Sequence, residues 1–127
     1  QANRLASPRV FRQFEAKAAA GSHASGRRYQ GRPDGATVDA EGCYWVAMFE
    51  GGQLLRFSPL GEQLAALPVP VQCPTMPCFG GDDLRTLFVT SARRGRPADE
   101  LEQRPASGQV IAMRAEVSGL PVHFFQE

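Results

Sequence analysis

Two stretches of this sequence present the same order of short apolar runs, and this internal repeat restricts the possible folds more than any other feature. Residues 33–35 (PDG) lead into ATVDAEG, YWVAMF and GQLLRF, and residues 74–76 (PTM) lead into PCFGGDD, TLFVTSA and GQVIAM. Asp34 and Thr75 hold the same place in the two copies, about 40 residues apart. A period of about 40 to 45 residues is typical of a four-stranded propeller blade.

The apolar runs are short, and glycines and prolines stand between them. This pattern predicts strands joined by tight turns. A unit of three or four such strands cannot bury its apolar faces alone, so the units must stack. We therefore expect an all-β fold, a partial β-propeller with about the last two blades and an outer strand of the preceding one. Since an array needs at least about three units and a propeller must close to hide its edges, we expect the chain to be incomplete.

The positions of the apolar runs also predict where the outer strand and the two blades begin and end. Residues 9–16 (RVFRQFEA) are predicted to form the outer strand, residues 33–70 one blade and residues 74–125 the last blade, all within a single propeller domain over 1–127. The last blade carries a polar, charged insertion at residues 93–107, between its second and third strands. An exposed loop with room for one helical turn is expected there.

The composition, 43% hydrophobic and 21% charged, is typical of a soluble globular domain. No apolar stretch approaches the roughly 18 residues of a spanning helix, and the N-terminus lacks the apolar core of a signal peptide. We therefore expect a cytoplasmic protein without membrane contact. The odd number of cysteines, Cys43, Cys73 and Cys78, favours reduced thiols. Cys73 and Cys78 have a C-x4-C spacing without a second pair, which predicts buried apolar cysteines rather than a zinc site.

The formal net charge is +1, but residues 1–32 hold seven bases against Glu15 alone. A nucleic-acid arm would need a groove-reading motif or aromatic platforms beyond Phe11, Phe14 and Tyr29. A solvated edge that lies against the acidic body of the chain is the favoured interpretation, and no nucleic-acid partner is expected. The seven bases are Arg4, Arg9, Arg12, Lys17, Arg27, Arg28 and Arg32.

Motifs of other catalytic classes are missing from the sequence. It has no G-x-S-x-G elbow and no phosphate-binding loop, and its histidines are His23, in a glycine-rich stretch, and His123, near the end. A serine or cysteine triad is therefore disfavoured. Five aromatic residues lie in predicted strands and are expected to form the core between blades rather than a sugar platform. These are Trp45, Phe49, Phe57, Phe79 and Phe88.

Three pieces of the sequence resemble the last third of the gluconolactonase and senescence marker protein (regucalcin) family of six-bladed propellers. They are PDG with VDAEG and WVA behind it, CFGGDDLRTLFVTSAR at residues 78–93, and the closing GLPVHFF at residues 119–125. The resemblance runs from about Arg9 to Phe125, and FGG followed by TLFVTSAR is its most distinctive part.

Members of this family open sugar lactones with a divalent metal ion, which carboxylates and amides hold at the mouth of the central channel. The resemblance implies that Asp34, which matches the aspartate of the PDG motif, is a metal ligand and a candidate catalytic base. The resemblance leaves the ion open among calcium, zinc, magnesium and manganese, since aspartate binds all four. Hard divalent cations prefer oxygen ligands. They polarise a carbonyl group and lower the pKa of bound water. On its three residues alone, PDG favours a turn in which Asp34 bonds its own backbone, and the wider resemblance reverses this preference.

Other polar residues near these motifs have weaker assignments. Thr75 matches the place of Asp34, so its hydroxyl is a possible substrate contact at the rim of the channel. A strand-start hydroxyl bonded to nearby backbone is the alternative for this residue. Asp39 and Glu41 lie where the first strand turns into the second, and they are interpreted as polar residues of a hairpin.

The other metal ligands of the family, a glutamate and two asparagines on earlier blades, have no counterpart here. One hypothesis is that the chain is the C-terminal part of a metal-dependent lactonase that opens an aldonolactone by metal-activated water, and is inactive by itself. The alternative is a non-catalytic metal-binding or truncated propeller fragment. Such a fragment would associate with another copy or complement the missing N-terminal blades. The expected partners are thus a sugar lactone and either of these chains.

Overall fold

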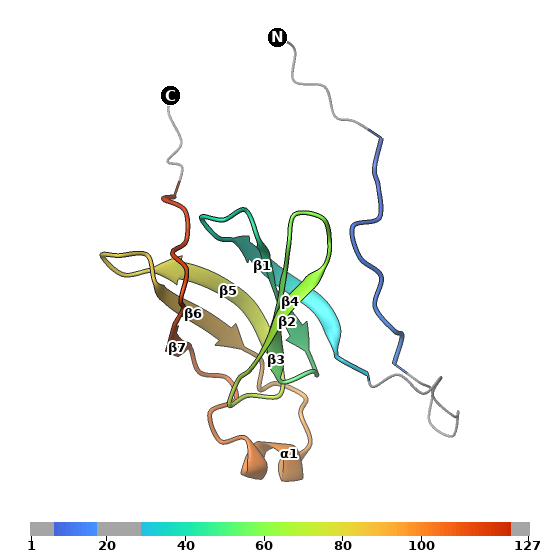
Figure 1. Ribbon diagram of the computed structural model, residues 1–127. Coiled ribbons are helices and arrows are strands. Elements are labelled where there is room, and N and C mark those ends of the chain that lie inside the picture. The colour runs from blue at the N-terminus through green and yellow to red at the C-terminus, as the bar shows by residue number, and fades with distance from the viewer. Residues whose placement is uncertain (1–6, 18–28, 123–127) are drawn as a thin grey trace, which may run out of the picture.

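The computed structural model describes residues 7–17 and 29–122 and contains two antiparallel sheets and, in this part of the chain, almost no helix (Figure 1). This confirms the all-β fold class. The first sheet has the order β1-β2-β3-β4, with β1 (Arg32–Val38), β2 (Tyr44–Phe49), β3 (Gln53–Phe57) and β4 (Gln63–Pro68). The second has the order β5-β6-β7, with β5 (Pro74–Gly80), β6 (Thr86–Ser91) and β7 (Ile111–Arg114), and α1 (Ala98–Gln103) lies between β6 and β7.

Each sheet is a meander whose strands follow one another in chain order, as in a propeller blade. The first strands of the two blades, β1 and β5, lie side by side, so the blades meet along these strands (Figure 1). The predicted insertion at residues 93–107 contains α1, whose six residues make little more than one helical turn. Among the described residues, no helix is long and apolar enough to cross a membrane.

The core between the blades comes from the facing sides of the two sheets. Trp45 and Phe79 pack edge to face with ring centroids 6.0 Å apart. Leu54 and Leu87 are fully buried beside them. Because successive side chains of a strand point to opposite faces of the sheet, one face of each sheet enters this core. The remaining members are Ala47, Val69, Val71, Val89 and Ala115.

The aromatic residues divide into three groups. Trp45, Phe57 and Phe79 are buried, as predicted. Phe49 is half-buried, and its ring contacts two arginine side chains. Phe88 is 40% exposed, so its predicted place in the core is wrong for this chain. The reason is its position on β6, where it faces away from the first sheet while its neighbours on either side enter the core.

The face of the second sheet that carries Phe88 has no covering layer among the described residues. Cys78, Phe88 and Ala112 are neighbours across β5, β6 and β7, and Met76 lies further along β5. Met76 is 44% exposed, and Cys78 is exposed too, which corrects the prediction that it is buried. Cys73 is buried as predicted. We call Met76, Cys78, Phe88 and Ala112 the open face.

Residues 9–16 do not form the predicted outer strand, because no strand of the described chain lies beside them to complete a ladder. The segment instead packs its aromatic side chains on the first sheet. Phe11 and Phe14 contact the Phe57 ring edge to face, with centroids 6.3 and 5.9 Å away. They cover the second apolar cluster, formed by Val46, Met48, Leu55 and Phe57.

The two ends of the sheets carry different connections. At the end where β1 and β5 begin lie residues 29–31, the β2–β3 turn at 50–52, the β4–β5 connection at 69–73 and the segment 92–110 with α1. We call this the α1 end. The other hairpin turns lie at the opposite end, where Asp39 also bridges to Gly119. His23, His123 and Phe125 of the sequence motifs lie outside the described residues.

Candidate functional site

Asp34 is the third residue of β1, at the α1 end of the first blade. The pairing of β1 with β2 shifts register between Pro33 and Ala36, so Asp34 and Gly35 together form a bulge. A bulge redirects the side chain of its extra residue away from the regular alternation of the strand. Asp34 is exposed, and no hydrogen bond or ion pair of its carboxylate is seen among the described residues. This carboxylate is therefore open to a ligand.

Thr75 lies at the corresponding place of the second blade. The pairing of β5 with β6 shifts register between Pro74 and Met76, which places Thr75 in a bulge as well. Its hydroxyl group is 2.7 Å from the Thr90 hydroxyl. Both inner strands thus begin with a bulge at the α1 end, and the repeat seen in the sequence is a repeat in backbone geometry.

A close approach between β1 and β5 brings the two bulges together. A Cβ atom on Gly35 would overlap the Met76 side chain and lie 2.6 Å from the Thr75 carbonyl oxygen. No side chain fits between the strands there, and glycine is the residue that allows this contact. The structure therefore places the Thr75 backbone against the residue that follows Asp34.

Glu50, which the sequence analysis did not single out, is the centre of a charged cluster at the same end. It lies in the β2–β3 turn with φ of +64°, a conformation that is uncommon outside glycine. Its side chain is only 12% exposed. The Lys17 Nζ, Arg96 Nη1 and Tyr29 hydroxyl donors lie 3.0, 3.2 and 3.3 Å from its carboxylate oxygens. Its carbonyl oxygen accepts a hydrogen bond of 2.6 Å from Gln72 Nε2.

The cations around Glu50 stabilise the ionised form of its carboxylate. The hydrogen bond from Lys17 lowers its pKa most, burial opposes this, and Arg96 and Arg32 lower it further, so the pKa of Glu50 lies below its ordinary value. Burial, and then the charge of Glu50, raise the pKa of Tyr29. Glu50 is therefore a fixed anion at neutral pH. In the sequence, the only signal that could have pointed to Glu50 is its position before two glycines, in a turn between two predicted strands.

Arg96 attaches the insertion to this cluster. Its guanidinium also donates to Glu100 of α1, with Nε 2.8 Å from Oε1, and lies 5.9 Å from the centre of the Phe49 ring. The hydrogen bonds to Glu100 and Glu50 raise the pKa of Arg96 further above its ordinary value. Because Glu50 is in the first blade and Arg96 follows the second strand of the second blade, their ion pair ties the insertion to the α1 end of both blades.

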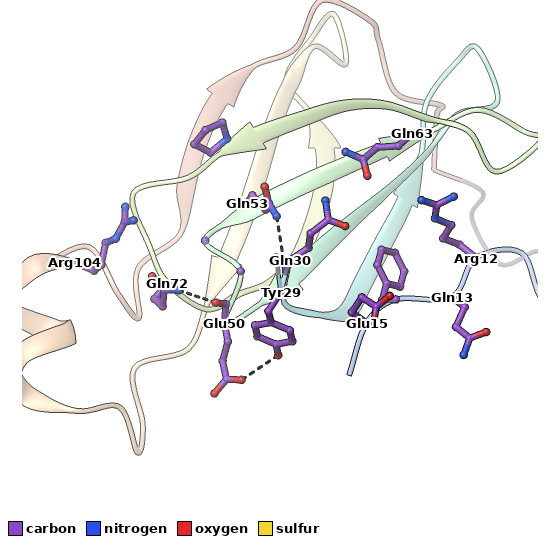
Figure 2. A pocket seen from close by; sticks show the side chains of 14 residues that line it. Arg12, Gln13, Glu15, Tyr29, Gln30, Glu50, Gln53, Gln63, Gln72 and Arg104 are labelled. Carbon is purple, nitrogen blue, oxygen red and sulfur yellow. Dashed lines mark hydrogen bonds between the residues drawn. The ribbon is translucent and has the colours of Figure 1, made fainter. Parts of the chain in front are cut away.

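A polar cleft of about 940 Å³ opens beside Glu50, between residues 12–15 and the first sheet (Figure 2). Tyr29, Gln30 and Gln53 line it, and Gln53 Nε2 donates to the Gln30 carbonyl oxygen at 3.1 Å. Neither Asp34 nor Thr75 is among its lining residues, so this cleft is not the place where the predicted site residues meet. Its other walls come from Arg12, Gln13, Phe14, Glu15, Gly51, Gly52, Gln63, Pro68, Gln72 and Arg104.

Asp39, interpreted from the sequence as a hairpin residue, is a buried structural anchor. Its side chain accepts hydrogen bonds from Trp45 Nε1 and Arg56 Nε, both at 2.8 Å, and from the backbone N–H groups of Glu41 and Cys43, both at 2.9 Å. Burial raises the pKa of Asp39, but these donors outweigh it and bring the pKa below its ordinary value. All the lone pairs of this carboxylate are engaged, so it holds the hairpin together rather than meeting a ligand.

The described residues do not form a complete metal site. Over 7–17 and 29–122 there is no group of three or more His, Cys, Asp or Glu residues that could hold an ion. A hard divalent cation needs several oxygen ligands, and one exposed carboxylate supplies only one or two. The described residues alone therefore do not fit a divalent ion, and Asp34 can contribute only its one carboxylate.

Two adjacent meanders that meet along their inner strands, with bulges at one end of those strands, are blades of a β-propeller. The chain belongs to the SMP-30/Gluconolactonase/LRE-like family, whose sequence pattern matches residues 1–93. The resemblance stated from the sequence is thereby confirmed, and a partial propeller fits the structure.

Comparison with known proteins gives the same result. The chain is 54% identical over 89 residues to the 6-deoxy-6-sulfogluconolactonase of Pseudomonas putida, a match that covers 70% of this chain and 31% of the relative. It is 37% identical over 95 residues to the regucalcin of Oryctolagus cuniculus, which covers 73% and 32%. The chain thus spans about a third of the length of the curated relatives it matches.

Solved structures resemble the fold over a similar extent. A regucalcin of Agrobacterium tumefaciens, described as a calcium-binding protein, superimposes with a TM-score of 0.65 at 35% identity, covering 69% of this chain and 30% of that one. A luciferin-regenerating enzyme superimposes with a TM-score of 0.58 at 32% identity, with the same coverage.

Proposed function

We propose that this chain forms the C-terminal two blades of a sugar lactone hydrolase. The observation that carries the proposal is the open carboxylate of Asp34, displayed by a bulge at the start of an inner strand and next to Thr75 of the neighbouring blade. Membership of the SMP-30/Gluconolactonase/LRE-like family and the similarity to a lactonase support it. The substrate is an aldonolactone.

In this reaction water attacks the lactone carbonyl carbon, the ring C–O bond breaks, and the ring oxygen takes up a proton to give an aldonic acid. Asp34 is in a position to accept a proton from the attacking water, because its carboxylate has no competing partner. The Thr75 hydroxyl can donate to an oxygen of the sugar at the rim. As the family resemblance implies, we also propose that the complete protein binds a divalent metal ion, with Asp34 as one ligand and the others outside this chain.

The open face favours a chain that functions together with further blades. Met76 and Phe88 expose 44% and 40% of their surface, and a propeller covers such a face with the next blade. We propose that further blades of the same protein cover it, and that a second copy does so only in their absence. We also propose a cytoplasmic location, which three unpaired cysteines favour.

The test is hydrolysis of glucono-δ-lactone by the complete protein and by its Asp34→Asn variant, followed as acid release. If Asp34 accepts the proton, loss of the carboxylate lowers kcat by about 100-fold or more. The matched control is Asp82→Asn, because Asp82 is another exposed carboxylate but lies in the β5–β6 turn at the opposite end. An Asp34→Asn variant as active as Asp82→Asn would contradict the proposal.

A further inference from the structure

Arg32 is the first residue of β1 and precedes Asp34 by two positions. Two residues of extended strand span about 7 Å. Arg32 lies opposite Phe49 in the β1–β2 ladder, so the two side chains share a face. That face is the one directed at the second blade, because Trp45 and Ala47 precede Phe49 at alternate positions and enter the core between the blades.

The Arg32 side chain is held in place without being buried. Its guanidinium lies 5.0 Å from the centre of the Phe49 ring, within the range of a cation–π contact. Its Nη2 lies 3.7 Å from Glu50 Oε2. The side chain still exposes 60% of its surface. A planar cation is thus oriented at the α1 end, on the strand that carries Asp34 two residues further along.

Glu50 is one anion shared among three cations, Lys17, Arg96 and Arg32, so it neutralises Arg32 only in part. Its oxygens have nearer partners in Lys17, Arg96 and Tyr29, at 3.0, 3.2 and 3.3 Å, and Arg32 at 3.7 Å is beyond hydrogen-bonding distance. A guanidinium carries five N–H donors in a rigid plane. Those of Arg32 make no hydrogen bond seen in the described part of the chain, so they are free to bind an anion.

We propose that Arg32 is a specificity-determining residue that binds a negatively charged sulfonate or phosphate group at the far carbon of the lactone substrate. The guanidinium plane matches two oxygens of such a group, which makes a bidentate, charge-assisted contact. The backbone positions of Arg32 and Asp34 are about 7 Å apart along the strand, so both side chains start within the length of one six-carbon sugar. This inference rests on the proposed lactonase function, and it names the class of lactone.

Arg32 is better suited to this task than the other exposed arginines of the α1 end. Arg93 and Arg94 lie in the insertion, whereas Arg32 starts a strand of the sheet, and a site built on a strand is more rigid than one on a loop. Arg96 has Glu50 and Glu100 as close partners and is only 15% exposed.

The test compares three substrates of the complete protein: glucono-δ-lactone, its 6-deoxy-6-sulfo analogue and 6-phosphogluconolactone. Arg32→Leu is expected to lower kcat/KM for the charged lactones by about 10- to 100-fold, mostly through KM, since it removes hydrogen bonds to a charged group. The neutral lactone should react as before, and Arg32→Lys should recover part of the loss. The two charged substrates show whether sulfonate or phosphate is preferred.

Arg114→Leu is the matched control, because Arg114 is 62% exposed but lies at the end of β7, away from Asp34, and pairs with Asp83. It should affect none of the three substrates. An equal loss on neutral and charged lactones in Arg32→Leu, or a wild-type enzyme without preference for charge, would overturn the inference. A circular dichroism melt shows whether each variant is folded, and Arg32→Gln replaces Arg32→Leu if the latter is not.

Failure of the proposed function gives a different result, namely no hydrolysis of any lactone by the wild-type protein. Calorimetric titration with 6-deoxy-6-sulfogluconate, the open-chain product, then decides the inference by itself. Binding that Arg32→Leu weakens by about 10-fold or more supports an anion subsite. Absence of binding, or binding that Arg32→Leu leaves unchanged, overturns it.

Discussion

Gly35 of β1 lies directly against Met76 of β5, so that even a methyl group on Gly35 would overlap the Met76 side chain and come within 2.6 Å of the Thr75 carbonyl oxygen. This contact sets the distance between the inner strands of the two blades. It also sets the distance between the two bulges that carry Asp34 and Thr75. A small change at Gly35 should therefore act on both stability and activity.

We expect Gly35→Ala to destabilise the complete protein by about 1–3 kcal/mol, because the Met76 side chain can move but the backbone of Thr75 must shift as well. The shift displaces Asp34, so kcat should fall too. Thermal unfolding and lactone hydrolysis measure the two effects. Gly80→Ala is the control, since its methyl group would meet only the Phe88 ring on the open face. Equal effects of the two substitutions would contradict the close approach.

Asp39→Asn should destabilise the protein by about 2–4 kcal/mol in urea unfolding, because Asp39 is fully buried and its loss of charge leaves Arg56 without its buried partner. The control is Asp83→Asn. Asp83 lies in the β5–β6 turn, the first hairpin turn of the second blade, and pairs with Arg114 of that blade's third strand, β7. Its side chain is 51% exposed. Solvent screens such a surface pair, so Asp83→Asn should cost much less stability than Asp39→Asn. Equal costs for the two variants would show that Asp39 is not the anchor we describe.

Low pH should lower the folding stability of the protein through Asp39. The pKa of Asp39 is lowered in the folded chain, so the unfolded chain binds more protons as the pH falls, and folding loses stability. The contribution is complete above the unfolded pKa of about 4 and disappears as the pH passes below it through the folded value. Asp83, whose pKa is lowered to about 2, acts in the same direction. Urea midpoints at pH 7 and pH 3 should therefore differ less in Asp39→Asn than in the wild type.

Much of this arrangement could be predicted from the sequence, because it depends on local patterns. Period-two apolar runs separated by glycine predict strands and turns, and the repeat places Asp34 and Thr75 at equivalent positions. The charged cluster could not be predicted in this way. Glu50, Arg32 and Arg96 lie far apart in the chain and meet only when β1, the β2–β3 turn and the insertion reach the same end of the sheets.

The exposure of Phe88 and Cys78 and the lack of a strand at residues 9–16 have a different cause. Each depends on whether a neighbouring layer is present, which the strand's own sequence does not encode. An apolar side chain on an alternating strand is buried only if a second sheet covers its face. The period-two pattern predicts which residues share a face, and the packing decides whether that face is covered.

Removal of metal ions should abolish lactone hydrolysis by the complete protein and leave this chain unaffected. The described residues contain no group of ligands that could hold an ion, so a chelator has nothing to remove from this part of the chain. Hydrolysis before and after dialysis against EDTA, with re-addition of calcium, zinc, magnesium or manganese in turn, measures the first effect. The circular dichroism spectrum of the isolated chain with and without EDTA measures the second. Activity that survives the chelator would contradict a metal ligand role for Asp34.

The isolated 127-residue chain should associate or unfold, because the open face exposes Met76, Cys78 and Phe88 together on one side of the second sheet. If it associates through this face, Phe88→Glu should shift sedimentation toward the monomer, since a charge cannot be buried without a partner. Leu60→Glu should have no such effect, although Leu60 is 96% exposed, because it lies singly in the β3–β4 turn. A wild-type chain that sediments as a monomer and melts cooperatively would show that two blades are stable without a covering layer.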